Sequence, residues 1–529
     1  MLRRPVQLLG LLAVGFMIGF AGLAFAALLA RASGGDALPP LSYIGGILGF
    51  TLKQAGLSVL LSVAGALPVA LAMARFRRFH GRSLVMALML VPLGLPVLPG
   101  IFGLLEIWGR QGSLNQFLQA LGLPPFSPYG LSGILLAHVF FNLPLAARLF
   151  LVALDAIPAQ QWRLAASLDL PRLSLFRFVE WPAILRVLPG IAGLIFMLCM
   201  TSFTIILTLG GGPSTSTLEV ALYQALKFEF DPARAAILIL LQLVLTIAVF
   251  RLLALFSRPE TDKIAHAGAS FIGLPAGWVE RTGFTTVLVA FVGLVAAPIV
   301  AIFLFGLRSG LQSLFSQPVF WQAFGTSLTI ALGAGLLSSC LTVAIAYAAQ
   351  DARLRWAKSL ILLYRLPDLM LVLPPLALGS GWFLILLAVD LADHLAPLVV
   401  LVINALMAMP FAMRLVGPAI ATHLERTDRL AQSLDIRGVS RLKIIDWPVL
   451  RQPVLAGLGF AMALSLGDLG AIALFSSDGF ITLPALLYAR LGSYRSGDAA
   501  GLSLILAGLS LLLMVPALMR ERANSGEFR

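Results

Sequence analysis

Long apolar runs separated by short polar segments dominate the chain from one end to the other. Each run is about 20 residues long, which is the length that crosses roughly 30 Å of hydrocarbon as an α-helix. A transmembrane barrel would show short segments of alternating polarity instead, and the sequence has none. The pattern predicts twelve membrane-spanning helices near residues 8–30, 52–74, 83–105, 131–151, 184–208, 234–256, 284–306, 325–348, 359–387, 396–416, 453–475 and 499–519.

Two of these runs, the third and the ninth, are interrupted by prolines. Proline removes a backbone donor and disturbs the preceding turn, so it kinks or ends a helix. We therefore expect both runs to be kinked or partly re-entrant instead of straight. The prolines concerned are Pro92, Pro96 and Pro99 in the third run, and Pro367, Pro374 and Pro375 in the ninth.

The composition agrees with a membrane protein. Of the 529 residues, 59% are hydrophobic and 12% are charged, whereas soluble proteins carry about a quarter charged residues. The net charge of +13 does not indicate a nucleic-acid-binding protein, because the basic residues lie in short loops between apolar runs. Cys199 and Cys340 lie inside apolar runs, so we expect neither a disulfide nor a metal site.

The distribution of loop charges predicts the orientation. Lysine and arginine concentrate in the loops after the second, fourth, eighth and tenth runs, whereas the opposite loops contain few. Cytoplasmic loops carry the excess of basic residues, so both termini are expected in the cytoplasm. The chain then divides into a first six-helix unit, a cytoplasmic linker, a second six-helix unit and a cytoplasmic tail, at residues 1–256, 257–283, 284–519 and 520–529.

An internal repeat relates the two units. The segment Arg163-Leu-Ala-Ala-Ser-Leu-Asp169 recurs 266 residues later as Arg429-Leu-Ala-Gln-Ser-Leu-Asp435. At the same offset, Glu180-Trp-Pro182 matches Asp446-Trp-Pro448. A constant offset between matching residues from 163 to 182 and from 429 to 448 indicates a duplicated unit. The predicted fold is therefore an all-α polytopic membrane protein with two homologous six-helix halves about a pseudo-two-fold axis.

Each repeated segment lies in the basic loop after the fourth span of its half. Its spacing predicts a short helix on the membrane surface that presents Leu164, Ala165 and Leu168 to a protein partner. A loop helix that packs only on its own bundle is the alternative, but one register in both halves favours a two-fold symmetric partner. The candidate coupling residues are Arg163, Leu164, Ala165, Leu168, Asp169, Arg429, Leu430, Ala431, Leu434 and Asp435.

The two segments resemble the EAA loops of ABC importer permeases, with the pattern E-A-A-x-x-x-G and a proline thirteen residues after the glycine. Pro182 and Pro448 lie thirteen residues after Asp169 and Asp435. Both copies depart from the pattern, with arginine at the glutamate position and aspartate at the glycine position, and aspartate adopts a left-handed backbone less readily. The resemblance implies a type I ABC importer permease whose loops dock on an ATPase.

Other short motifs resemble those of bacterial thiamine transporter permeases. The resemblance implies import of thiamine and its phosphate esters, with a homodimeric ABC ATPase and a periplasmic thiamine-binding protein as partners. Ferric-iron permeases share the twelve-span layout and are the alternative, and a secondary transporter with two six-helix halves is a more distant one. The motifs include Gly109-Arg-Gln-Gly112, Ser127-Pro-Tyr-Gly130, Gly210-Gly-Gly-Pro213 and Asp231-Pro-Ala-Arg-Ala-Ala236.

The sequence contains no phosphate-binding loop of the form G-x-x-x-x-G-K-[ST]. ATP and Mg²⁺ are therefore expected on a separate subunit, and we expect this chain to bind no cofactor and no metal. A membrane-embedded enzyme would need clustered catalytic residues, whereas the polar residues within the apolar runs are isolated. We predict a transport subunit of the bacterial inner membrane that is not itself an enzyme.

Asp468 lies well inside the eleventh apolar run, where a carboxylate is costly and points to a functional role. Its repeat partner is Ser202, and both are candidates for the substrate path. An acid suits a cationic cargo, although a role in gating or helix packing is an equal alternative. His138 lies in the fourth span with Asn404 as its repeat partner, and we expect it to bond between helices.

Overall fold

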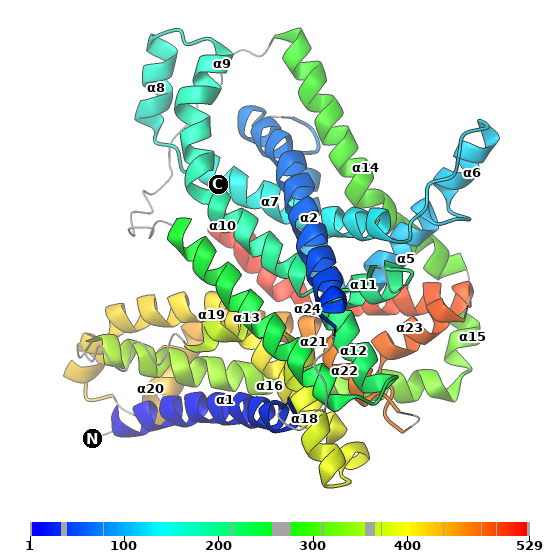
Figure 1. The fold of residues 1–529 in the computed structure, drawn as a ribbon. Coiled ribbons are helices and arrows are strands. Elements are labelled where there is room, and N and C mark those ends of the chain that lie inside the picture. The colour runs from blue at the N-terminus through cyan, green and yellow to red at the C-terminus, as the bar shows by residue number, and fades with distance from the viewer. Residues whose placement is uncertain are drawn as a thin grey trace.

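The computed structural model describes residues 3–32, 40–77, 79–212, 215–256, 277–308, 311–354, 366–371, 373–436, 438–477, 479–493 and 495–525. This part of the chain is built from helices (Figure 1). Ten of them are long and apolar enough to cross a membrane, and one bent pair raises the number to eleven. The prediction of an all-α polytopic membrane protein is confirmed, and the twelve predicted spans roughly fit this number.

Six helices of each half follow in corresponding order. Those of the first half are α1 (Arg3–Ala32), α2 (Leu41–Arg75), α5 (Val97–Trp108), α7 (Leu131–Asp155), α10 (Trp181–Met200) and α13 (Pro232–Phe256). Those of the second half are α14 (Trp278–Arg308), α16 (Pro318–Leu354), α18 (Pro375–Ala388), α19 (Ala392–Ser433), α21 (Trp447–Gly467) and α24 (Ser496–Ser525). Most of the predicted linker, residues 257–276, lies outside the described residues.

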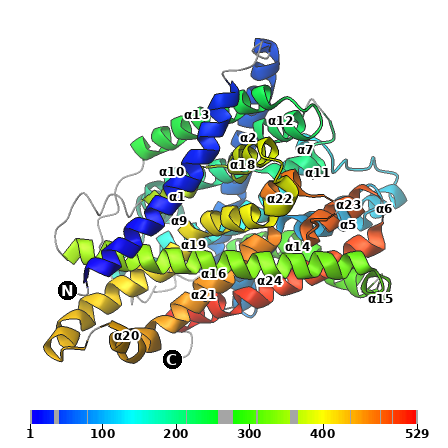
Figure 2. The ribbon, with the colours of Figure 1, turned by 90° about the horizontal axis from the view of Figure 1, so that it is seen from below.

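The first helix of each half packs against the other half. Helix α1 lies along α16 and α18, and α14 lies along α2 and α5 (Figures 1 and 2). At the first of these contacts, the Phe20 and Trp382 rings stack with centroids 4.6 Å apart, and Trp382 Nε1 donates to the Phe20 carbonyl at 3.1 Å. Because each half's first helix is exchanged in this way, separating the two halves would expose the surfaces that these first helices cover.

A glycine permits the close approach of helices at both exchanged contacts. A Cβ atom at Gly381 of α18 would overlap the backbone of Ala24 in α1, with the Ala24 Cα only 2.7 Å away. A Cβ at Gly103 of α5 would meet the Pro298 carbonyl carbon of α14 at 3.0 Å and overlap its oxygen. Small residues let helix backbones approach in this way within a membrane. The obstacle is backbone in both cases, so a rotamer change cannot relieve it.

We predict that Gly381→Ala and Gly103→Ala each destabilise the folded protein by about 1–3 kcal/mol, the usual cost of overpacking. The measurement is the thermal unfolding midpoint of the purified protein in detergent. Gly19→Ala is the matched control, because Gly19 lies on α1 and a Cβ there meets nothing within 4 Å. Equal midpoints for Gly19→Ala and Gly381→Ala would contradict the close crossing of α1 and α18.

The third predicted span is broken, as its prolines led us to expect. The segments Arg82–Gly94 and Val97–Ala120 meet at an angle of 118°. Leu95 has an extended backbone, with φ −82° and ψ 123°, because the ring of Pro96 disfavours a helical conformation in the preceding residue. Part of the ninth predicted span lies outside the described residues, and its described helix α18 has 14 residues, too few to cross a membrane alone.

The fifth and eleventh predicted spans are also broken, and here the prediction of continuous helices was wrong. Helix α10 ends at Met200, and the short helix α11 (Phe203–Leu209) follows after a turn. In the second half, α21 ends at Gly467 and is followed by α22 (Gly470–Phe475). Hydropathy did not reveal these breaks, because the residues on both sides are apolar. Irregular backbone at such depth is tolerated where it is buried in protein or lines a cavity.

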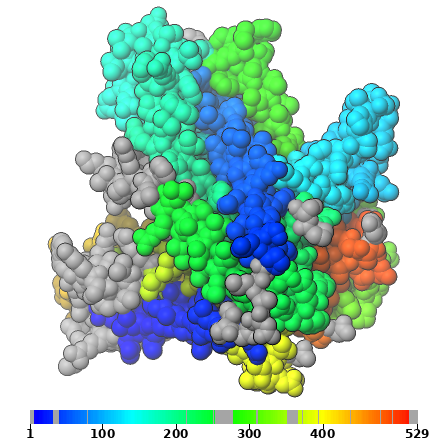
Figure 3. Space-filling view, in the orientation of Figure 1, coloured from blue at the N-terminus to red at the C-terminus, as the bar shows by residue number. Residues whose placement is uncertain are grey.

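The repeated coupling segments lie on one side of the molecule. Helix α8 (Ala159–Ser167), which carries the first segment, projects there with α9 (Arg172–Leu175) (Figures 1 and 3). The second segment lies at the C-terminal end of α19, just before α20 (Gly438–Arg441), on the same side (Figure 1). The short helix α6 (Ser113–Ala120) projects on the opposite side. Helix α1 begins, and α24 ends, toward the side of α20 (Figure 2).

Candidate functional site

A cavity of about 410 Å³ lies between the two halves. Its volume falls within the range of small-molecule sites, about 300–1,000 Å³. Residues of α7, α10 and α11 line it from the first half, and residues of α19, α21 and α22 line it from the second. The turn at Pro96 also reaches the cavity. The breaks in the third, fifth and eleventh predicted spans thus all meet at this cavity.

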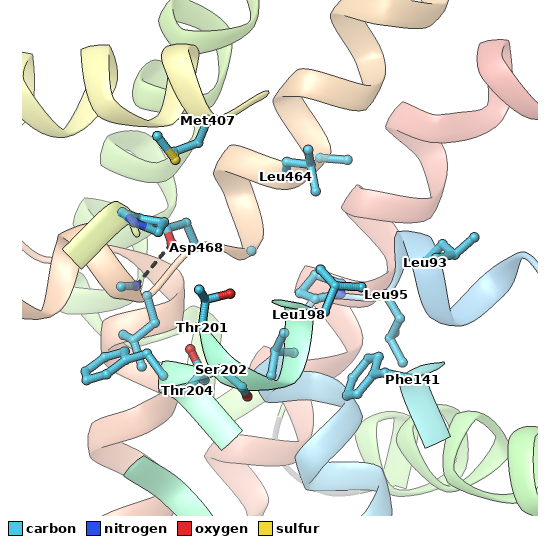
Figure 4. A pocket seen from close by; sticks show the side chains of 18 of the residues that line it. Leu93, Leu95, Phe141, Leu198, Thr201, Ser202, Thr204, Met407, Leu464 and Asp468 are labelled. Atoms are coloured by element: carbon cyan, nitrogen blue, oxygen red, sulfur yellow. Dashed lines mark hydrogen bonds between the residues drawn. The ribbon is translucent and has the colours of Figure 1, made fainter. Parts of the chain in front are cut away.

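The walls of the cavity are nearly symmetric. Several lining residues form pairs at the repeat offset of 266 residues, namely Phe141 with Met407, Leu145 with Phe411, and Leu198 with Leu464. In Figure 4, Met407 and Leu464 lie above the cavity, and their partners Phe141 and Leu198 lie below it. The cavity is therefore positioned on the pseudo-two-fold axis that relates the halves.

The two predicted path residues, Asp468 and Ser202, both line this cavity (Figure 4). The Asp468 carboxylate accepts hydrogen bonds from the backbone N–H groups of Gly470 at 3.1 Å and Ala471 at 3.3 Å, so it caps α22. Ser202 precedes α11 at the equivalent place and makes no such cap bond. The structure brings the two residues together from opposite halves, at the ends of the two broken helices.

His138 and Asn404, a second repeat pair, also line the cavity. His138 Nδ1 lies 2.8 Å from the Ser58 hydroxyl on α2, and Asn404 Nδ2 donates to the Ser465 hydroxyl on α21 at 2.9 Å. Both side chains therefore bond between helices, as we expected for His138.

Sequence reasoning missed Glu219, which falls between the fifth and sixth predicted spans, on the side opposite the basic loops. In the structure Glu219 lies in α12 (Leu218–Lys227), is 1% exposed and lines the cavity. Its Oε1 accepts a hydrogen bond from Gln242 Nε2 at 2.9 Å. The sequence signal that could have revealed it is that Glu219 is the only charged residue between Leu218 and Tyr223. An acid within such an apolar segment is a candidate for burial.

The coupling segments are helical in both halves, and only part of the predicted surface is available. Leu164 and Leu430 are 59% and 60% exposed, and Leu168 and Leu434 are similarly exposed. Arg163, Arg429, Asp169 and Asp435 are exposed as well. Ala165 and Ala431 are only 3% and 1% exposed. The expectation that Ala165 is presented to a partner was wrong, because the helix turns this small residue toward its own bundle and leaves the leucines outside.

The two segments differ in how they join the preceding helix. Helix α7 ends at Asp155 and α8 begins after Pro158, whereas α19 runs without a break from Ala392 through Ser433. Position 158 has proline, which disfavours a helical conformation in the residue before it. Its repeat counterpart is Leu424, which permits the helix to continue.

Both segments end in the same C-terminal turn. Asp169 and Asp435 have positive φ values of 45° and 51°. In the first copy, the Leu170 N–H donates to the Ala165 carbonyl at 3.2 Å, and the Asp169 N–H donates to the Ala166 carbonyl at 3.2 Å. This pair of bonds is the Schellman motif, in which glycine is usual at the left-handed position. The aspartates thus adopt the backbone conformation for which the family pattern uses glycine.

We predict that Asp169→Gly stabilises the protein by about 1 kcal/mol, because glycine adopts the left-handed conformation without the strain of a side chain. The measurement is the thermal unfolding midpoint. Ser167→Gly, two residues earlier at a helical position, is the matched control and is expected to destabilise by roughly 0.5 kcal/mol. A loss of stability in both variants would contradict the strain assigned to Asp169.

Each coupling segment is followed by a π-helical turn, Phe176–Glu180 in the first half and Leu442–Asp446 in the second. The last residue of each turn, Glu180 or Asp446, is a buried acid. Glu180 is fully buried and forms two hydrogen bonds with Arg75, of 2.9 Å from Nε and 2.5 Å from a terminal nitrogen. Arg75 also contacts Glu280 of α14 at 2.9 Å. The base of the first coupling segment is therefore tied both to its own half and to the exchanged helix.

The second copy keeps the buried acid but replaces its partners. Asp446 Oδ1 lies 2.9 Å from His423 Nε2, and Asp446 Oδ2 lies 3.5 Å from Arg441 Nε. Arg441 also contacts Asp428 at 2.8 Å. The repeat therefore retains the position of the carboxylate, whereas the compensating charges come from different helices in each half.

Comparison with known proteins places this architecture among transport proteins. The family described as binding-protein-dependent transport system inner membrane component matches residues 66–259. The thiamine transport system permease protein of Brucella abortus (strain 2308) is 45% identical over 520 residues, covering 97% of this chain and 95% of the relative. The corresponding proteins of Escherichia coli (strain K12) and Haemophilus influenzae are 43% and 38% identical, covering 89% and 95% of this chain and 88% and 93% of the relatives. No solved structure matches the chain significantly.

Proposed function

The chain belongs to the bacterial thiamine transport permeases, and we propose that it moves thiamine and its phosphate esters from the periplasm to the cytoplasm. It is a multi-pass inner-membrane transport subunit that works with an ATPase and a substrate-binding protein and is not itself an enzyme. The observation that carries the assignment is 45% identity over 97% of the chain to a thiamine permease. The ferric-iron alternative is not favoured by these relatives.

The central cavity is the passage in this proposal, and Asp468 and Ser202 belong to the substrate path. The location of the cavity between the halves supports this, since a relative movement of the halves would open it to either side. We expect Asp468→Ala to reduce uptake at normal abundance in the membrane. Full transport by Asp468→Ala would exclude a role for this carboxylate in the path.

The two coupling segments are held by a homodimeric ATPase on the cytoplasmic side, where both termini also lie. ATP binding closes the dimer, draws the segments together and opens the passage outward, and hydrolysis resets it. The exposed leucines on both segments support a symmetric partner, because a two-fold dimer presents the same surface twice. The chain binds no cofactor in this scheme, and ATP with Mg²⁺ binds to the partner.

The test is uptake by the complete complex reconstituted in liposomes. The complex contains this chain, its ATPase and its periplasmic thiamine-binding protein, and labelled thiamine is offered outside with ATP inside. We expect ATP-dependent accumulation of thiamine and none of labelled ferric iron. Accumulation driven by an ion gradient without ATP would instead indicate a secondary transporter.

A further inference from the structure

The cavity combines nearly symmetric walls with polar groups that differ between the halves. At equivalent positions of the repeat, the first half has Ser202 where the second half has Asp468, and it has His138 where the second half has Asn404. Glu219 is the second residue of α12, whereas the second residue of α23 (Leu483–Gly492) in the other half is Pro484. Symmetric walls determine the shape of the cavity, whereas unlike polar groups can orient an asymmetric molecule within it.

His138 carries an unused hydrogen-bonding atom at the cavity. The side chain is 2% exposed, and Nδ1 is paired with the Ser58 hydroxyl at 2.8 Å. Nε2 has no hydrogen-bond partner among the described residues, although it is fully buried. An unpaired polar atom of this kind costs free energy unless a ligand or water completes it. His138 lines the cavity, but Nε2 itself has almost no accessible surface, so a bound molecule supplies the missing partner only when the ring turns toward the cavity.

The charged groups at the cavity are carboxylates. Glu219 reaches it from the first half and is buried, and Asp468 reaches it from the second half and is half-buried. Among the described residues that line the cavity there is no lysine or arginine. Two acids without a basic counterpart in a low-dielectric site favour a positively charged molecule, since charges attract more strongly there than in water.

The apolar part of the lining suits a flat, cationic ring. Phe141, Phe411 and Phe460 all reach the cavity, and the last two lie with ring centroids 5.7 Å apart. Aromatic faces attract cations placed within about 6 Å. The thioether of Met407 adds a polarisable surface beside them.

We propose that the cavity is a transient binding site for a heteroaromatic cation, in which the acid pair Glu219 and Asp468 attracts the fixed charge and His138 Nε2 bonds to an amine-bearing ring. Thiamine has this chemistry, with a thiazolium ring at one end and an aminopyrimidine ring at the other. The inference rests on the proposed function and adds the residues that recognise the cargo within the membrane.

The experiment compares thiamine with a neutral isostere in which carbon replaces the thiazolium nitrogen. Uptake of each is measured in liposomes containing the complete complex, with the thiamine-binding protein saturated by the molecule tested. Wild type is expected to prefer thiamine. Glu219→Gln and Asp468→Asn keep the shape of each side chain and are expected to lower the thiamine-to-isostere ratio roughly tenfold, since each removes a charge-assisted contact.

His138→Asn gives a different expected signature. Its variant side chain matches that of the repeat partner Asn404, and both molecules share the aminopyrimidine ring, so uptake of both should fall together while the ratio and the unfolding midpoint stay unchanged. A lowered unfolding midpoint would show a packing defect and would overturn the role of His138. If Glu219→Gln or Asp468→Asn instead caused a general packing defect, uptake of thiamine and of the isostere would fall equally. This result would overturn the proposal for the carboxylates. The ratio therefore separates recognition of charge from structural damage.

Asp390→Asn is the matched control, because Asp390 is an exposed acid with φ 54° that asparagine tolerates. It is expected to keep the wild-type ratio. If wild-type complex imports no thiamine, the proposed function fails. If wild-type complex imports thiamine but the two carboxylate variants keep its ratio, the proposed function stands and this inference fails.

Discussion

Glutamate at both Leu164 and Leu430 is expected to abolish ATP-driven uptake while the membrane-embedded bundle remains folded. These leucines are 59% and 60% exposed, one on each coupling segment, so most of each side chain makes no contact within the chain. A hot-spot residue at a protein interface contributes about 2 kcal/mol or more, which corresponds to roughly thirtyfold in affinity per site. A buried charge adds a desolvation penalty to that loss.

The measurements are co-purification of the ATPase with the permease and uptake of labelled thiamine. Leu123→Glu is the matched control, because Leu123 is 49% exposed and follows α6, the helix that projects on the side opposite the coupling segments. It is expected to leave ATPase association unchanged. Undiminished association in the Leu164→Glu/Leu430→Glu variant would show that the ATPase docks elsewhere.

Arg75→Met alone is expected to destabilise the protein by about 3–5 kcal/mol, because it leaves the fully buried Glu180 carboxylate without its arginine partner. Glu180→Gln is expected to cost less, because Arg75 keeps its contact with Glu280. Replacing both with apolar residues, as in Arg75→Met/Glu180→Leu, removes both charges and is expected to cost less than Arg75→Met alone. Glu280 keeps Arg172 as a partner in the double variant.

The unfolding midpoint in detergent reports these effects, with a fall on the order of 10 °C expected for Arg75→Met and a smaller fall for Glu180→Gln. Asp155→Asn is the matched control, because the Arg77–Asp155 pair has side chains 35% and 41% exposed. Such exposed pairs contribute at most about 1 kcal/mol. A double variant as unstable as the sum of the singles would indicate that Arg75 and Glu180 do not act as a pair.

The breaks in the membrane helices show where periodicity stops being informative. Prolines marked the bend at Pro96, because their effect on the backbone is local. The breaks at Ser202 and Asp468 have no such marker, since the flanking residues are as apolar as those of a continuous helix. Both breaks lie at the cavity. There the surroundings can satisfy the backbone N–H and C=O groups that a regular helix would satisfy internally.

The coupling segments show the same division on a smaller scale. The repeat located both segments and the positions of Asp169 and Asp435 at their ends. Which side of each helix faces outward depended on packing, and Ala165 and Ala431 turned out to be buried. The acid retained at Glu180 and Asp446 was visible as a motif, whereas its partners Arg75 and His423 lie about 105 and 23 residues away along the chain.

The sequence by itself determined that this protein is a duplicated helical membrane protein, because span length, loop charge and repeat register are properties of consecutive residues. It also located Asp468 as a carboxylate at an unusual depth. Only the tertiary structure decided that Asp468, Glu219 and His138 share one cavity and that each first helix packs on the opposite half. These arrangements depend on contacts between segments far apart in the chain, and such contacts leave no period or spacing in the sequence.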